Sequence, residues 1–151
     1  MKLAEALQER ADIKRNLTGL RERLARVALV QEGEKPAEDP KELLKIQDDC
    51  LSRLEYLAAA INHSNDVIQV NGMTLTQLIA KKDILLMRLN AYKNLARELG
   101  FNTSRARGTE IRILTTLSVP ELQTEMDRMS KNIRILDNLL QETNWTKDLI
   151  E

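Results

Sequence analysis

The sequence has few of the residues that build disulfide-bonded, metal-binding or membrane-spanning proteins. Of its 151 residues, one is cysteine and one is histidine, so an intrachain disulfide is excluded and a zinc site lacks ligands. We therefore expect no metal and no cofactor. No apolar run approaches the roughly 18 residues that a bilayer crossing needs, and the first ten residues carry charges where a signal peptide needs apolar side chains. These features predict a cytoplasmic protein with no membrane partner.

Aromatic residues and net charge are scarce as well. Aromatic side chains make up 3% of the chain, and 23 Lys and Arg balance 23 Asp and Glu. Nucleic-acid binders usually show a basic excess or a basic face, and few rings are available here to stack on bases. Nucleic-acid binding is therefore not expected. Low aromatic content with abundant Leu, Ala, Arg, Glu and Lys is typical of long helices.

Four long segments carry apolar residues at alternating steps of three and four, the spacing of a coiled-coil seam. The predicted helices cover residues 2–29, 40–65 and 74–99, and a fourth runs from Ser118 to near the C-terminus. Adjacent apolar pairs such as Leu43 and Leu44 make the stripes wider than one seam, which predicts burial on two sides. Gly19, inside the first helix, indicates a close crossing or a bend.

Two linkers carry clear turn signals. In residues 31–40, Gly33 and Pro36 break any helix, and Asp39 is placed to cap the second helix with Pro40 in its first turn. This stretch is predicted to be a solvated loop. The alternative is an ordered loop that lines a site or a subunit contact, because its four acidic groups could hold a cation.

Two stretches have the character of β structure. Asn71-Gly72 favours a type I′ hairpin turn, and Thr74 with Gln77 fits a capping box for the third helix. Gly100 is expected to end that helix. Residues 110–117 alternate apolar and β-branched side chains at period two, which predicts a strand paired with the hairpin across the fold or between subunits.

The fold class that follows is mainly α. We expect a single helical domain over residues 1–151, a long antiparallel helical bundle or coiled coil of about four helices with a small β-hairpin or strand element. The apolar width of the helices and the unpaired strand also predict a homo-oligomer, at least a dimer, since large apolar patches are uncommon on monomers.

Several short motifs stand in the same order as in a family of small bacterial proteins. They are Ala11-Asp12, Val30-Gln31-Glu32-Gly33-Glu34 through Pro40, Ile61-Asn62 to Asn65, and Gln141-Glu142 with Asn144-Trp145-Thr146. On these motifs the chain resembles the septicolysin family over essentially its whole length. The resemblance implies a functionally uncharacterised protein with no catalytic residues to carry over. The stretch 105–110 departs from the pattern, which has more Tyr and Ser there.

The most site-like feature is the polar cluster at the end of the second predicted helix. It comprises Asn62, His63, Ser64, Asn65 and Asp66. Helix capping and turn hydrogen bonds are the simplest use of such residues. Alternatively, because the second and fourth helices run parallel in an up-down-up-down bundle, the cluster meets the end of the fourth helix. Asn62, His63, Asn65, Asp66, Asn144 and Trp145 would then form a small ligand-binding pocket.

Two other constellations are weaker. The carboxylate pairs Glu9/Asp12 and Glu121/Glu125 share helix faces that could bind Mg²⁺, but such pairs occur in any charged helix. Two basic clusters could bind phosphate, although Glu22 and Glu110 are interleaved with them. The clusters are Arg21, Arg23 and Arg26, and Arg105, Arg107 and Arg112.

The sequence therefore predicts a self-associating structural or interaction module with no assignable catalysis. The alternative is a small-ligand or nucleotide-binding enzyme that uses the polar pocket. Polar groups buried together beside Trp145 would favour the enzyme, and solvated helix caps would favour the module.

Overall fold

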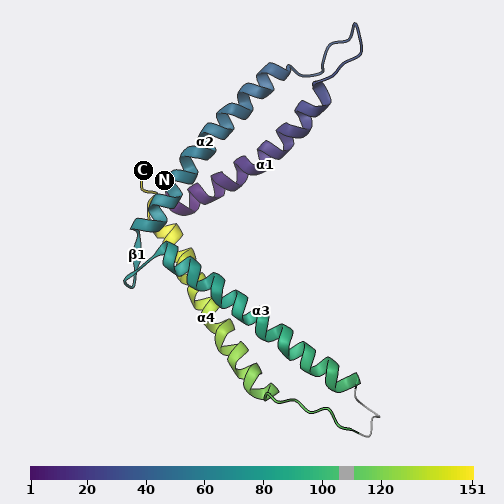
Figure 1. Ribbon diagram of the computed structural model, residues 1–151. Coiled ribbons are helices and arrows are strands. Elements are labelled where there is room, and N and C mark those ends of the chain that lie inside the picture. Colours follow the sequence, from purple (N-terminus) through teal and green to yellow (C-terminus); the bar gives the residue numbers. More distant parts are fainter. Residues whose placement is uncertain (106–110) are drawn as a thin grey trace. The chain divides into compact units, whose positions relative to one another are not determined.

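The protein is built almost entirely from helices, as the fold class predicted. The computed structural model describes residues 1–105 and 111–151, with the backbone alone for 101–105. Over these residues it has four helices and one two-stranded sheet (Figure 1). The helices are α1 (Leu3–Val27), α2 (Pro40–Val67), α3 (Leu75–Arg105) and α4 (Val119–Thr146), and the strands are β1 (Gln69–Val70) and β2 (Met73–Thr74). The predicted mainly α fold with a small β-hairpin is confirmed.

The chain packs as two compact units. The first comprises Met1–Val70 with Thr143–Glu151, and the second comprises Asn71–Glu142. In the first unit α1 and α2 lie side by side as a helical hairpin, and in the second α3 and α4 do so (Figure 1). The expected single domain over residues 1–151 is not tested by this division and stays a prediction.

The core of the first unit follows a seven-residue repeat. The buried positions of α1 with this spacing are Ala6, Ile13, Leu20 and Val27. On α2 the same spacing joins Leu43, Cys50, Leu57 and Ser64, of which all but the half-buried Cys50 are buried. Leu20, Val27 and Leu43 form one cluster, and Cys50 packs against it. Each such aliphatic side chain contributes about 1.5–3 kcal/mol when fully buried, so this seam holds the hairpin together.

The second unit has a similar core between α3 and α4. Leu89, Met126 and Met129 form its buried cluster, and Leu85, Tyr92, Ala96 and Ile133 pack against it. Lys82 lies on the same stripe, and its Nζ is 2.8 Å from Asp137 Oδ1. The ammonium group on this otherwise apolar stripe is therefore paired with a carboxylate of the neighbouring helix.

Local signals placed the helix starts and the turn correctly. The Asp39 side chain accepts from Lys41 N at 2.9 Å with Pro40 in the first turn. The capping box of α3 is complete, because Thr74 N donates to Gln77 Oε1 and Gln77 N donates to Thr74 Oγ1. Asn71 and Gly72 have φ of 52° and 79°, the positive values that a type I′ turn requires.

Three expectations about the backbone were wrong. Residues 111–117 form neither strand nor helix, and residue 110 lies outside the described residues. A strand needs a partner, and within the described residues the sheet contains β1 and β2 alone. Gly100 does not end α3, which continues to Arg105, since a helical glycine costs only about 1 kcal/mol relative to alanine. Gly19 marks no close crossing, because a Cβ there would meet no heavy atom within 4 Å.

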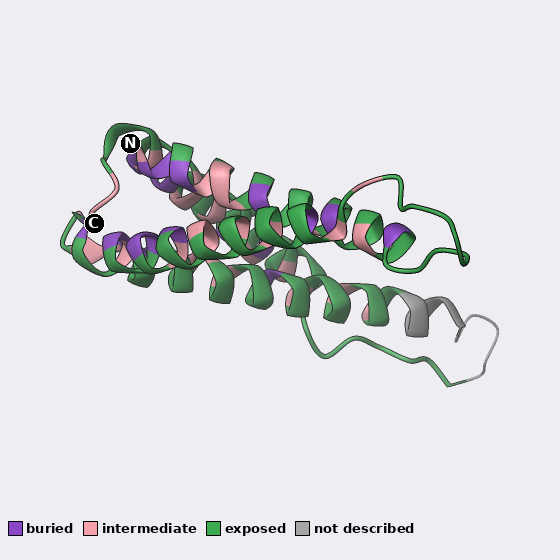
Figure 2. Cartoon of the chain, turned by 90° about the horizontal axis from the view of Figure 1, so that it is seen from above, coloured by how far each residue is buried: buried purple, intermediate pink, exposed green. Residues whose placement is uncertain are grey.

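Most side chains of the helices nevertheless face solvent. Figure 2 shows exposed residues along nearly every turn, with buried residues at intervals. Leu44 and Leu51 on α2 are 50% and 44% exposed, and Ile79 and Leu86 on α3 are 37% and 38% exposed. A hairpin of two helices buries one face of each, and the second half of each wide apolar stripe stays uncovered within its own unit.

The turn at Gly72 provides the first prediction. Gly72→Val places a β-branched side chain at a φ of +79°, which costs about 1–3 kcal/mol of unfolding free energy. Gly19→Ala is the matched control, because α1 has open space there and the change should stabilise by about 0.5–1 kcal/mol. Urea unfolding followed by circular dichroism measures both. Equal stability of Gly72→Val and wild type would contradict the turn geometry.

Candidate functional site

Ser64 lies where the end of α2 meets the C-terminal segment. It follows Leu57 by seven residues, so the helix turns it toward the core, and its side chain is fully buried. Its Oγ donates to Ala60 O at 2.8 Å and accepts from Ile150 N at 2.8 Å. A buried hydroxyl is stable only when it is hydrogen-bonded. Here the hydroxyl also supplies the acceptor for a backbone amide 86 residues away.

The two ends of the chain are joined beside Ser64 by what we call the terminal clasp, residues 1–3 with 147–149. Its backbone hydrogen bonds run from Leu3 N to Lys147 O at 3.0 Å and from Leu149 N to Met1 O at 2.9 Å. Lys2 Nζ adds an ion pair with Asp148 at 2.9 Å and a hydrogen bond to Thr146 O at 3.2 Å. The hydrogen bond and charge of Lys2 lower the pKa of the Asp148 carboxyl. The clasp thus ties the start of α1 to the residues after α4.

An ionic cluster joins α1, α2 and the C-terminal residue. Arg53 Nε and Nη2 donate to the two carboxylate oxygens of Glu9 at 2.7 and 2.9 Å. The Arg53 guanidinium also lies 5.1 Å from the centre of the Tyr56 ring, within cation–π range. The hydrogen bond from Arg53 lowers the pKa of Glu9 despite some burial, and a hydrogen bond with Glu151 raises the pKa of Tyr56.

The residues proposed for a ligand pocket lie around these contacts. Asn62, His63 and Asp66 are exposed, Asn65 and Asn144 are half-buried, and Trp145 is 52% exposed. Ser64 of the polar cluster contacts Ile150, four residues beyond the end of α4, whereas the meeting expected from the sequence was with the end of that helix. A ligand pocket formed by Asn62, His63, Asn65, Asp66, Asn144 and Trp145 is not tested by these contacts and stays a prediction.

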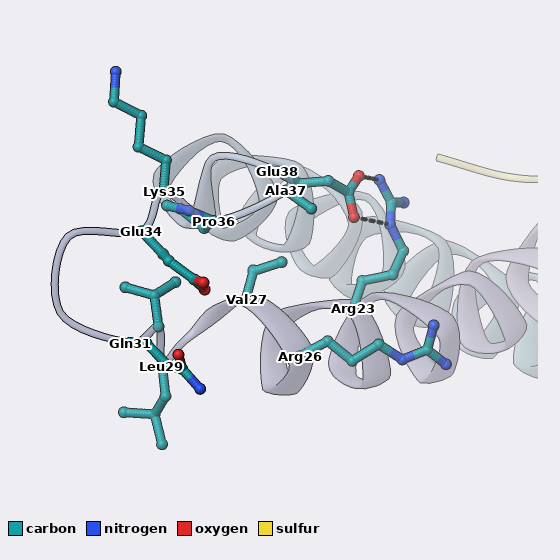
Figure 3. Close-up of a pocket in the computed structure, with 11 residues that line it drawn as sticks. Arg23, Arg26, Val27, Leu29, Gln31, Glu34, Lys35, Pro36, Ala37 and Glu38 are labelled. Atoms are coloured by element: carbon teal, nitrogen blue, oxygen red, sulfur yellow. Dashed lines mark hydrogen bonds and ion pairs between the residues drawn. The ribbon is translucent and has the colours of Figure 1, made fainter.

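The loop between α1 and α2 encloses an open hollow of about 650 Å³. Val27 and Glu34 point into it and Lys35 points away (Figure 3). Glu38 faces Arg23, whose Nε donates at 3.1 Å and whose Nη2 also donates, and this pairing lowers the pKa of Glu38. Asp39 caps α2. Two of the four acidic groups are therefore engaged within the protein, which weakens the cation-binding alternative.

The remaining candidate carboxylates are also partly engaged. Glu9 pairs with Arg53, Asp12 pairs with Arg15, and Glu125 Oε2 is 2.8 Å from Arg128 Nη2. In residues 1–105 and 111–151, no three His, Cys, Asp or Glu side chains gather in a way that could hold a metal ion. Over the same residues, no helix has the length and apolar content of a membrane span.

A second, smaller hollow runs between α1 and α2. This groove has a volume of about 350 Å³ and is lined by Leu17, Thr18, Arg21, Leu24, Gln47 and Leu51. Arg21 is therefore at the rim of an apolar groove, Arg23 is neutralised by Glu38, and Arg26 lies 3.9 Å from Glu22. Arg107 and Glu110 of the other basic cluster lie outside the described residues, and so does the side chain of Arg105.

Comparison with other proteins gives a family and one solved relative. The model of a family described as a family of unknown function (DUF6847) matches residues 10–149. A crystal structure described as a functionally unknown conserved protein from Corynebacterium diphtheriae is 35% identical in sequence, with a TM-score of 0.88. That comparison covers 99% of this chain and 98% of the other. No curated protein matches the chain.

These findings correct the resemblance drawn from the short motifs. The assignment to a septicolysin family was wrong, because neither the matching family nor the solved relative carries that description. The motifs consist largely of caps, loops and polar helix ends. Asp39 and Pro40, for example, start α2, and such local signals recur in unrelated helical proteins.

The buried hydroxyl at the clasp provides the second prediction. Ser64→Ala removes the acceptor of Ile150 N–H, and an unsatisfied buried donor costs about 1–3 kcal/mol. Ser52→Ala, on the exposed side of the same helix, should cause no loss. Urea unfolding measures the difference, and hydrogen exchange at Ile150 should quicken in Ser64→Ala alone. Unchanged exchange at Ile150 would count against the contact.

The ionic cluster provides the third prediction. The pKa of Glu9 is lower in the folded state, so its carboxylate stabilises the fold above its unfolded pKa of about 4.3. That contribution is lost as the pH falls through the folded pKa. Glu9→Gln should therefore lower the urea midpoint at neutral pH, and the deficit should disappear in acid. Asp49→Asn, an exposed change on α2, is the control. A deficit that persists in acid would contradict the charge-based explanation.

Proposed function

Because the chain belongs to the family of unknown function DUF6847, whose description names no activity, we propose a role from its exposed surface. The protein acts as a self-associating helical interaction module and binds a second copy of itself through one face of the α1–α2 hairpin. The observation that carries the proposal is the exposed pair Leu44 and Leu51 beside the groove between these helices. No catalytic residue is part of it.

The accessible surface supports association. Units that are only two helices thick cannot bury both halves of a wide apolar stripe. Leu44 and Leu51 are accordingly 50% and 44% exposed within the first unit, and such uncovered apolar side chains are available to a contact of standard size, which buries about 800 Å² per partner.

The apolar face itself is continuous at helical spacing. Leu44 and Leu51 each follow a seam residue of α2, Leu43 and Cys50, and are seven residues apart. Leu51 forms one wall of the groove, and the half-buried Leu17 and Leu24 of α1 form the other. Helices of a partner that pack into this groove would cover its apolar side chains, as the third and fourth helices of a four-helix bundle cover the first two.

The charges beside the groove favour a second copy as that partner. Lys14 and Arg21, seven residues apart, lie on the α1 side, and Asp48 and Glu55 follow Leu44 and Leu51 by four residues on the α2 side. All four are exposed. In a two-fold arrangement whose axis runs along the helices, α1 of one copy faces α2 of the other. Lys14 and Arg21 of each copy then face Asp48 and Glu55 of the other. The two copies contribute the same surface, so the favourable charge contact is made twice, as in an isologous interface.

The coiled-coil and cytoplasmic expectations belong to the same proposal. The seven-residue spacing of Ala6, Ile13, Leu20 and Val27 is the repeat of a coiled-coil seam, and the paired hairpins would pack as an antiparallel four-helix layer. Cys50 is a free, half-buried thiol, which suits a reducing compartment. The alternative ligand pocket around Asn62 and Trp145 would instead require a hollow at the terminal clasp.

The fourth prediction tests this face. Leu51→Lys keeps an exposed helical position and a good helix former, so the fold should survive while the contact loses an apolar side chain and gains a charge. We expect association to weaken by about 30-fold or more, the loss of about 2 kcal/mol that marks an interface hot spot. Light scattering measures the mass, and Leu29→Lys in the loop, 87% exposed, is the control.

Charge reversal tests the orientation of the same contact. Arg21→Glu and Asp48→Arg should each weaken the dimer, and the double variant should restore it, because each reversed charge again faces its opposite. A wild-type mass equal to the 17.3 kDa of one chain at micromolar concentration would overturn the proposal. Additive losses in the double variant would overturn the facing of α1 and α2.

A further inference from the structure

The segment that precedes α4, residues 111–117, is largely apolar, has the alternating sequence pattern of a strand and is exposed to solvent. In residues 111–117 the exposed fractions are 82% for Ile111, 54% for Ile113, 77% for Leu114 and 45% for Leu117. Within the described part of the chain, residues 112–117 belong to no helix or strand and take part in no hydrogen bond or ion pair. Their backbone donors and acceptors are therefore satisfied by solvent or by another molecule.

The composition of this segment is that of a strand. Ile111, Ile113, Thr115 and Leu117 alternate on one face, and Arg112 is the single charge. β-Branched residues at period two fit a pleated surface, but a strand forms only when a second strand pairs with it. Residues 112–117 thus have the composition of a strand, and within the described residues no second strand pairs with them.

We propose that residues 111–117 of two copies pair with each other as antiparallel strands, in a register centred on Leu114. This contact rests on the proposed self-association, because a single pair of strands is marginally stable in water.

The segment is complementary to itself in this register. Leu114 faces its own copy, Ile113 faces Thr115, and Ile111 faces Leu117. Arg112 faces Thr116, so the two arginines do not oppose each other. Like charges that lie directly opposite each other would destabilise the pair. The face with Ile111, Ile113, Thr115 and Leu117 is apolar or β-branched on both strands. Such cross-strand pairs each contribute roughly 0.2–1 kcal/mol, which makes this register preferable to those that bring the two arginines together.

Disulfide cross-linking can determine which residues of the two strands oppose each other. In a Cys50→Ala background, single cysteines are placed at positions 113, 114 and 115, and mild oxidation is followed by non-reducing electrophoresis. Directly opposed Cα atoms lie about 4.5–5.5 Å apart in an antiparallel pair, inside the range of about 4.4–6.8 Å that a disulfide needs. Diagonal neighbours lie about 7–8 Å apart and fall outside it.

The expected result is specific. Leu114→Cys alone forms a linked dimer, Ile113→Cys and Thr115→Cys alone do not, and a mixture of these two does. Met87→Cys, 67% exposed on α3, is the control for chance collisions and should stay unlinked. Circular dichroism confirms that each variant is folded, which is expected because the segment carries no regular structure. Equal linking at 113, 114 and 115, or linking of Leu114→Cys no faster than Met87→Cys, would overturn the proposal.

Failure of this contact can be separated from failure of the helical contact. If the helical contact is wrong, wild type has the mass of one chain and Leu51→Lys changes nothing. If strand pairing alone is wrong, wild type remains a dimer that Leu51→Lys dissociates, and Leu114→Cys links no faster than the control. Ile113→Pro and Leu114→Pro give a second measure. Alternate residues of an antiparallel pair exchange hydrogen bonds, so one of the two changes removes a bonding N–H and should weaken association only when the strands pair.

Discussion

The structure depends on how much apolar surface a two-helix hairpin can bury. Each helix of a hairpin covers one face of its neighbour, so a narrow seam is hidden and a wider stripe is not. In the first unit the seam positions Leu20, Val27 and Leu43 are buried, while Leu44 and Leu51 beside them stay about half exposed. In the proposed self-association, the stripe that holds the hairpin together would continue directly into the surface that binds a second copy.

The first unit is closed at one end by polar contacts between residues far apart in the chain. The terminal clasp satisfies backbone groups of residues 1–3, and Ser64 satisfies Ile150 N–H from inside the core. Exposed ion pairs such as Lys2–Asp148 contribute little by themselves. The buried hydroxyl contributes more, because its loss would leave the part-buried Ile150 N–H without its acceptor.

Features set by neighbouring residues could be predicted from the sequence, and features set by distant ones could not. The seams, the Asp39 and Thr74 caps and the Asn71-Gly72 turn depend on spacing or on a few adjacent residues. The prediction of a strand at 110–117 was wrong for the described residues 111–117. Apolar residues at period two show that a segment could fit into a sheet, but they do not show that a second strand lies beside it. At the candidate site, the pocket of polar residues around Asn62 and Trp145 stays a prediction, and the link between Ser64 and Ile150 has no sequence signal beyond the seven-residue step from Leu57.

The carboxyl groups whose pKa is shifted are engaged in pairs within the protein. A catalytic carboxylate or base has to face a substrate, often with a pKa moved toward the working pH. The resolved carboxyl shifts here, at Glu9, Glu38 and Asp148, all run downward and all come from a paired Lys or Arg. Such groups are permanently charged at neutral pH and are already occupied. The apolar side chains of Leu44 and Leu51, by contrast, stay about half exposed within their own unit, and removing such surface from water is favourable.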